Sequence, residues 1–249
     1  MKNKSNDKAP YSRWIILLLF VGIFVAACSK DSTEEPEPTK PAETDTMFNR
    51  LITVRNFGEA LPEGSSPDDS QSPIYYSLET NSAVPLAYQK TDRWDLSFQG
   101  IFRSFIGGNN KAKGNLGEGG PGVGGIMIVK QDFDEVTDIP PDSQFKTGNA
   151  VVGTDDAGDF GQGVGYYIYD FSGGIFGDGS FEKQHVAYVM QEGRTIIVKT
   201  ARGNYAKIQM LSLYKDMLDP ATWTRYSPAP FFTFRYVLAK AGSTKFEIN

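Results

Sequence analysis

Residues 193–214 read GRTIIVKTARGNYAKIQMLSLY, and this stretch decides the fold class. Two runs rich in β-branched and other apolar residues flank the tripeptide Arg202-Gly203-Asn204. A glycine supplies the positive φ that a tight turn between two strands requires. The stretch therefore predicts an antiparallel β-hairpin.

Other segments of the chain have the same aromatic and β-branched composition. They are Leu51–Val54, Ile74–Leu78, Trp94–Phe98, Ile126–Val129, Tyr166–Tyr169 and Phe231–Val237. Glycine and proline separate these runs, and only Asp216–Trp223 leaves room for a helical turn. We find no internal repeat. The pattern predicts an all-β fold, mainly antiparallel, with two packed sheets and little helix.

Two glycine-rich stretches interrupt the strands. Ten glycines lie between Gly100 and Gly125, and seven lie between Gly161 and Gly179. We expect long, adaptable loops there, either carrying binding groups or serving as plain surface loops. The first stretch contains a formal G-x-G-x-x-G pattern, but the strand-like run Ile126–Val129 follows it. A dinucleotide site needs a helix at that place, so the pattern is not interpreted as one.

The composition excludes several classes of protein. The 249 residues include a single Cys and a single His, which argues against disulfide frameworks and against Cys-rich or multi-His zinc sites. The sequence pI of about 5.0 is unlike that of nucleic-acid binders, which need a basic surface. No G-x-S-x-G nucleophile motif is present. These absences favour a binding protein over an enzyme.

Acidic residues cluster at Asp155, Asp156 and Asp159. The twelve-position calcium loop pattern is absent around them. We therefore interpret these three residues as solvated loop acids. Paired carboxylates for glycoside hydrolysis stay open, because the sequence does not give their separation.

The N-terminus has the pattern of a secretory signal in residues 1–27. Basic residues precede a short apolar run, and Val25-Ala26-Ala27-Cys28 resembles a bacterial lipobox. The only Cys of the chain is at the position where a lipid would be attached, which predicts lipidation of Cys28. An ordinary signal peptide with a chance Cys, or a single-pass anchor, is the alternative.

Residues 28–46 are predicted to be a flexible tether, and residues 47–249 to be the folded domain. The tether is rich in proline and charge, which keeps a chain extended and solvated. Removal of residues 1–27 leaves 21 basic and 29 acidic residues, a net charge of −8. A charged stretch after the lipidated Cys also resembles the export signal of Bacteroidetes surface lipoproteins. We expect a lipid-anchored protein of the outer membrane, exposed at the cell surface.

Three segments together resemble the HmuY-like haem-binding lipoproteins of Bacteroidetes. The hairpin at 194–207 resembles the family's "RT-x-x-V-x-T-A-x-G-x-Y-A-K" signature. Trp94–Phe98 resembles the family's Trp-Asp strand, and Phe234–Val237 resembles its closing strand. The resemblance covers roughly residues 48–240.

The resemblance implies a non-enzymatic surface lipoprotein that binds haem or a related porphyrin and passes it to an outer-membrane receptor. Haem iron takes His or Met as axial ligands. A single His rules out two His ligands from one molecule. His185 and Met190 are the candidates for the downstream ligand, and Met127 is the candidate upstream, with a core role for Met127 as the alternative. Aromatic residues that would line a porphyrin pocket are Tyr166, Tyr167, Tyr169 and Tyr188.

A haem-free alternative uses the same scaffold. In that hypothesis the domain is a surface module that binds another ligand or protein through aromatic faces. Both hypotheses place the only contact with the membrane at the N-terminal lipid and predict no nucleic-acid partner.

Overall fold

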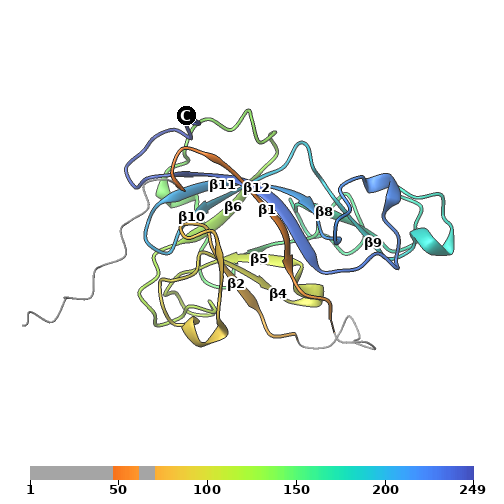
Figure 1. The fold of residues 1–249 in the computed structure, drawn as a ribbon, viewed down its shortest axis with the longest axis horizontal. Coiled ribbons are helices and arrows are strands. Elements are labelled where there is room, and N and C mark those ends of the chain that lie inside the picture. Colours follow the sequence, from red (N-terminus) through yellow and green to blue (C-terminus); the bar gives the residue numbers. More distant parts are fainter. Residues whose placement is uncertain (1–46, 62–70) are drawn as a thin grey trace, which may run out of the picture. The chain divides into compact units, whose positions relative to one another are not determined.

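The computed structural model describes residues 47–61 and 71–249. The predicted signal peptide, Cys28 and the tether lie outside the described residues. Within the described ranges, no helix is long and apolar enough to cross a membrane. No α-helix occurs in these ranges either, and strands form the regular structure (Figure 1). The prediction of an all-β fold is confirmed.

One five-stranded antiparallel sheet contains the hairpin of residues 193–214. Its order is β1 (Leu51–Gly58), β12 (Phe231–Ala239), β11 (Tyr205–Ser212), β10 (Thr195–Lys199) and β6 (Gly125–Val129). The hairpin pairs Ile196 with Ile208 and Lys199 with Tyr205, as the flanking apolar runs predict. The first and last strands of the domain, β1 and β12, are therefore neighbours in this sheet.

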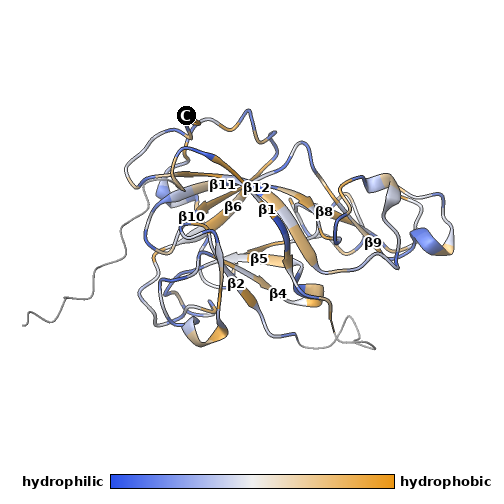
Figure 2. Cartoon of the chain, in the orientation of Figure 1, coloured by the Kyte–Doolittle hydropathy of each residue, from blue (hydrophilic) through white to orange (hydrophobic). Residues whose placement is uncertain are grey.

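The second sheet also has five antiparallel strands. Its order is β3 (Ser82–Val84), β2 (Ile74–Ser77), β4 (Leu96–Gln99), β5 (Phe105–Gly108) and β7 (Val151–Val152). The two sheets lie one above the other in Figure 1, and Figure 2 shows apolar residues along the strands of both. This arrangement confirms the predicted pair of packed sheets.

Aromatic rings fill the space between the sheets. Phe98 on β4 packs on Phe232 of β12 with ring centroids 4.3 Å apart, and Tyr76 on β2 meets Phe234 edge-on at 5.5 Å. Phe98, Phe232 and Phe234 have no exposed surface. Each fully buried ring of this kind contributes roughly 2–3 kcal/mol of hydrophobic free energy. The ring contacts between the sheets are thus a main source of stability.

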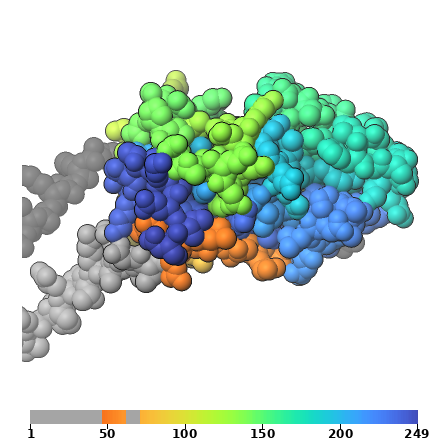
Figure 3. Space-filling model, turned by 90° about the horizontal axis from the view of Figure 1, so that it is seen from above, coloured from red at the N-terminus to blue at the C-terminus, as the bar shows by residue number. Residues whose placement is uncertain are grey.

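A two-stranded ribbon forms a third unit beside the sheets. It pairs β8 (Tyr167–Asp170) with β9 (Val186–Val189) and carries the long loop between them. We call residues 153–190 the ribbon lobe. The space-filling view shows this part of the chain, coloured teal to light blue, gathered at one end of the molecule (Figure 3).

Short 3₁₀ turns connect the strands. They are Leu86–Tyr88, Ile101–Arg103, Asp142–Gln144, Phe181–Lys183 and Pro220–Thr222. The helical turn expected within Asp216–Trp223 is present as the last of these, and the Asp219 carboxylate accepts a hydrogen bond from the Ala221 N–H at 3.0 Å to cap it.

The expectation of an adaptable loop across Gly100–Gly125 is wrong. The segment contains β5, and Asn109 within it has no exposed surface. A Cβ on Gly124 would stand 2.6 Å from the carbonyl oxygens of both Asn109 and Lys199. Several of these glycines are there because other backbone approaches too closely for a side chain, and the segment is packed rather than free to adapt.

Candidate functional site

The turn of the central hairpin is held by the strand that follows Trp94. The Asp95 carboxylate accepts hydrogen bonds from the Ala201 N–H at 3.0 Å and the Leu78 N–H at 2.8 Å. Burial, reinforced by the charge of Glu79, raises the pKa of Asp95 to about 7. Trp94 packs flat on Tyr75 with ring centroids 4.5 Å apart. Two motifs about a hundred residues apart in the sequence therefore contact each other directly.

Glu79, two residues after the end of β2 in the second sheet, also bonds to the hairpin turn. Its carboxylate accepts from the Thr200 hydroxyl at 2.8 Å and from the Asn204 side-chain amide at 2.7 Å. Arg202 makes ion pairs with Glu79 at 3.5 Å and with Asp92 at 3.1 Å. We call Glu79, Trp94, Asp95 and the turn 200–204 the hairpin clasp. Its polar groups are bonded to one another, so it serves structure and leaves little to bind a ligand.

The ribbon lobe has the opposite character, because large rings lie on its surface. Phe160 is 74% exposed and Phe181 60%, while most aromatic rings of the sheets are buried. Other exposed apolar side chains of the lobe are Val164, Phe171, Ile175 and Phe176. Apolar surface gathered in one region marks an interaction site.

His185 lies among these rings. Its Nδ1 atom is 2.8 Å from the Tyr169 hydroxyl, and its ring meets the Phe171 ring edge-on at 4.7 Å. Phe160 in turn packs against both Tyr169 and Phe171. We call Phe160, Tyr169, Phe171 and His185 the His185 face. Among the described residues, no hydrogen bond to His185 Nε2 is present, and the side chain is exposed.

The backbone of His185 is unusual for its residue type. Its φ is +61°, in the left-handed region that non-glycine residues seldom adopt. The His185 N–H donates to the Phe171 carbonyl at 3.3 Å, which ties this conformation to the ribbon. A strained residue with an exposed imidazole is a feature often found at binding sites.

A cation stands near the His185 face. The Arg225 guanidinium lies over the Phe181 ring at 3.9 Å from its centroid. Burial, with the charges of Tyr167 and Asp159, raises the pKa of Tyr169, and the charge of Arg225 opposes that shift. The arrangement therefore combines a nitrogen donor, flat apolar rings and a positive charge.

Acidic residues of the lobe have structural partners. Asp155 is buried and pairs with Arg194 at 2.8 Å, so its interpretation as a solvated loop acid is wrong. Burial favours the neutral form, but N–H bonds from Gly165 and Ala157 and the Arg194 charge hold the pKa of Asp155 below its usual value. Asp159 accepts from the Phe171 N–H at 2.8 Å. Over the described ranges, no three acidic, His or Cys residues gather as a metal site.

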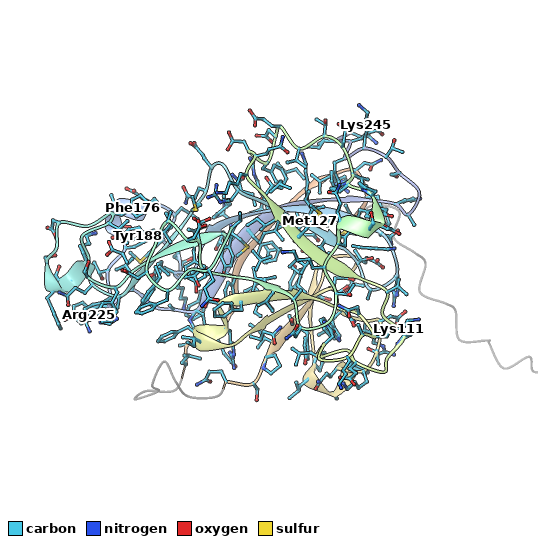
Figure 4. The ribbon with its side chains drawn as sticks, turned by 180° about the vertical axis from the view of Figure 1, so that it is seen from behind. Lys111, Met127, Phe176, Tyr188, Arg225 and Lys245 are labelled. Atoms are coloured by element: carbon cyan, nitrogen blue, oxygen red, sulfur yellow. The ribbon has the colours of Figure 1, made fainter. Side chains whose placement is uncertain are left out.

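The three predicted iron ligands lie at separate places. Met127 on β6 packs in a small cluster with Val136 and Ile197, on the floor of a hollow of about 350 Å³. Met190 follows the far end of β9, whose four extended residues separate it from His185 by roughly 16 Å. Figure 4 shows Met127 over the sheet, away from the labelled lobe residues Tyr188 and Phe176 and from Arg225. The structure therefore does not bring the three side chains together.

The predicted porphyrin-lining tyrosines divide between core and lobe surface. Tyr166 and Tyr167 are buried, and their hydroxyls bond to the carbonyl and the hydroxyl of Ser104. Tyr169 belongs to the His185 face, whereas Tyr188 is buried and packs on Phe176 and on Trp223, which lies outside the lobe. Phe160, Phe171 and Arg225 were not predicted as site residues. A single exposed aromatic or basic residue has no sequence pattern that would mark it.

Comparison with protein families identifies the fold's relatives. The model of the family described as HmuY protein matches residues 69–226. The chain belongs to the HmuY family. The HmuY match includes Trp94 and the hairpin and ends before the Phe234–Val237 segment. HmuY family members are non-enzymatic haem-binding proteins. No curated protein matches the chain.

Solved structures of bacterial proteins are also similar to this chain. One is the apo form of PinO from Porphyromonas gingivitis, with 15% identity over 78% of this chain and 99% of that chain, and a TM-score of 0.38. Another, from Bacteroides vulgatus, is provisionally described as HmuY-like and haem-binding. It has 11% identity over 79% of this chain and 95% of that chain, and a TM-score of 0.36. A third, from Bacteroides fragilis, is provisionally described as a lipoprotein. It has 12% identity over 76% of this chain and 91% of that chain, and a TM-score of 0.35. At these TM-scores, the similarities carry no residue-level argument.

Proposed function

We propose that this protein binds haem on the His185 face of the ribbon lobe, with His185 Nε2 as the axial ligand to iron. The observation that carries the proposal is the imidazole itself, held at Nδ1 by Tyr169 and free at Nε2. When the Nδ1–H donates to the Tyr169 oxygen, the lone pair of Nε2 points away for a metal. A fixed partner on the other ring nitrogen orients a metal-ligating His in this way.

The surroundings of His185 suit a flat, apolar ring with acidic groups at its edge. Phe160 and Phe171 offer exposed faces for contact with a porphyrin. Arg225 provides a positive charge for a propionate carboxylate, a pairing that guanidinium groups favour. Met127 and Met190 lie apart from this face, so of the three predicted ligands only His185 would contact the iron here.

The proposal extends to where the protein acts. Lipidation of Cys28 would anchor the domain to the outer membrane. We expect the domain to be exposed at the cell surface. A haem on an exposed face, held by one protein ligand, would be accessible to an outer-membrane receptor that takes it over. The family and the exposed ribbon lobe support this carrier function.

A hemin titration tests the proposal. We expect a saturable Soret shift at one equivalent of hemin, recorded in air and again with dithionite. His185→Ala should abolish the shift, and Tyr169→Phe should weaken binding about ten-fold because the orienting partner is lost. Met127→Ala serves as the control on the other side of the domain and should bind as the wild type does.

Other outcomes would redirect the assignment. Loss of binding in Met127→Ala or Met190→Ala, with His185→Ala unaffected, would move the ligand to that Met. A clearly tighter ferrous complex would indicate a thioether donor, which is soft and neutral. A flat titration in both redox states would favour the haem-free alternative, in which the exposed rings of the lobe bind another ligand or protein.

A further inference from the structure

Asp170 at the end of β8 is a buried carboxylate with only half of its oxygens satisfied. The side chain has no exposed surface. Its Oδ2 atom accepts the N–H groups of Ile175 and Phe176 at 2.9 and 3.0 Å. Its Oδ1 atom, also buried, has no hydrogen-bond partner among residues 47–61 and 71–249.

The charge of Asp170 is also unpaired. Within the described part of the chain, no Lys or Arg forms an ion pair with it; Lys183, on the same lobe, instead donates to the carbonyls of Ala221 and Trp223. A buried carboxylate without a cation is expensive, and proteins normally pair such a group or use it to bind a metal. Neither the exposed rings nor His185 bonds to this oxygen, so it has capacity for a further partner.

The loop that follows Asp170 is suited to surround a cation. It reads DFSGGIFGDGS from Asp170 to Ser180 and ends with a second carboxylate, Asp178, which is exposed. The Gly179 N–H bonds to the Gly173 carbonyl at 2.8 Å, so the loop closes on itself. The loop contains four glycines: Gly173 and Gly177 pack closely against Lys183, whereas a Cβ on Gly174 or Gly179 would meet little or nothing.

Both carboxylates act on the same neighbour. Burial raises the pKa of Tyr188, and the charges of Asp170 and then Asp178 raise it further, so both acids influence this one side chain. Figure 4 shows Tyr188 beside Phe176, the residue whose N–H bonds to Asp170. The negative charge is therefore concentrated within this single loop.

We propose that the loop Asp170–Ser180 binds a calcium ion, with Asp170 Oδ1 as its buried ligand and the Asp178 carboxylate as a second ligand. Calcium accepts six to eight oxygens in flexible geometry, and backbone carbonyls and water complete its shell. Magnesium requires a small, regular octahedron, which a glycine-rich loop does not impose. The ion would neutralise the buried charge and stiffen the loop that carries Phe171 and Phe176. The site does not depend on haem binding.

Terbium luminescence tests the site directly, because Tb³⁺ replaces Ca²⁺ and is excited through nearby aromatic rings. Tyr188, with Trp223 at 6.0 Å from its ring, would serve as the antenna. We expect haem-free protein to sensitise Tb³⁺, and Ca²⁺ but not equal Mg²⁺ to displace it. Addition of Ca²⁺ should also raise the thermal midpoint by a few degrees, reversibly with EGTA.

Variants decide whether the signal comes from this loop. Asp170→Asn should weaken Tb³⁺ binding at least ten-fold, and Asp178→Asn several-fold. The matched control is Asp156→Asn, an exposed acid of the same lobe that should bind as the wild type does. No sensitised signal, or an unchanged affinity in Asp170→Asn, would overturn the proposal. If Asp170→Asn does not fold, Asp178→Asn decides: wild-type affinity there would overturn it as well.

Discussion

The hairpin clasp and the ribbon lobe differ in where they put their aromatic and charged groups. In the clasp, Trp94 and Asp95 are buried and bonded to neighbouring strands and turns. In the lobe, Phe160 and His185 are exposed, and one nitrogen of the imidazole has no partner in the described structure. The residues that identify the family therefore hold the fold together, while the residues with free binding capacity lie elsewhere.

This difference explains why a family signature is a poor guide to the ligand site. The Asp95 carboxylate joins two distant strands, so a substitution there disturbs the whole domain. The His185 face rests on one ribbon and contributes little to the core between the sheets. Stability and haem binding should therefore respond to substitutions in different regions, and the predictions below test that separation.

The largest contrast should come from a matched pair of phenylalanine substitutions. Phe98→Ala removes a ring buried between the sheets and should cost about 3–5 kcal/mol of unfolding free energy. Phe160→Ala removes an exposed ring and should change stability by no more than about 0.5 kcal/mol, while weakening hemin binding. Urea unfolding followed by fluorescence measures both. Equal losses of stability would contradict the separation of the two regions.

Glycine substitutions should distinguish glycines that pack against other backbone from glycines in open positions. Gly124→Ala places a Cβ 2.6 Å from two carbonyl oxygens and should cost about 1–3 kcal/mol. Gly174→Ala, whose Cβ would meet only the Ser172 hydroxyl at 3.5 Å, should be close to neutral. Thermal unfolding of the two variants checks this. A neutral Gly124→Ala would restore the expectation of an adaptable first stretch.

The clasp should make stability depend on pH. The pKa of Asp95 is about 7 in the folded protein, against 3.8 for an unperturbed carboxyl. Between these values the folded state keeps a proton that the unfolded state has lost, so stability falls as pH rises. We expect the wild type to lose roughly 2 kcal/mol between pH 5.5 and 7.5. Asp95→Asn, which cannot ionise, should lose this slope, and parallel pH profiles would refute the assignment.

Substitution of His185 should change the stability of the fold only slightly. His185→Gly relieves a positive φ and should stabilise the fold by up to about 1 kcal/mol, because glycine adopts that conformation without strain. The same variant should lose hemin binding, since the imidazole is gone. Measuring both in one preparation distinguishes a binding residue from a structural one. A large loss of stability would assign His185 to the fold.

Much of the sheet architecture could be predicted from local pattern. The hairpin and the runs at 51–54, 126–129 and 231–237 became strands because alternating apolar residues bury one face in any such sandwich. Strands β3, β5, β7 and β9 were missed, since they are short and two of them adjoin glycine-rich sequence. Of the site, His185 was predicted from its rarity and the family resemblance, whereas Phe160, Phe171 and Arg225 had no signal.

The sequence by itself determined the all-β class, the hairpin and the membership of the HmuY family, because these follow from residue order over short distances. Only the tertiary structure decided that Asp95 meets Ala201, that Met127 lies apart from the ribbon lobe, and that one carboxylate oxygen of the buried Asp170 is unbonded among the described residues. Such facts depend on which distant segments pack together. The burial of a side chain and the identity of its bonding partners are properties of that packing, and no local sequence pattern encodes them.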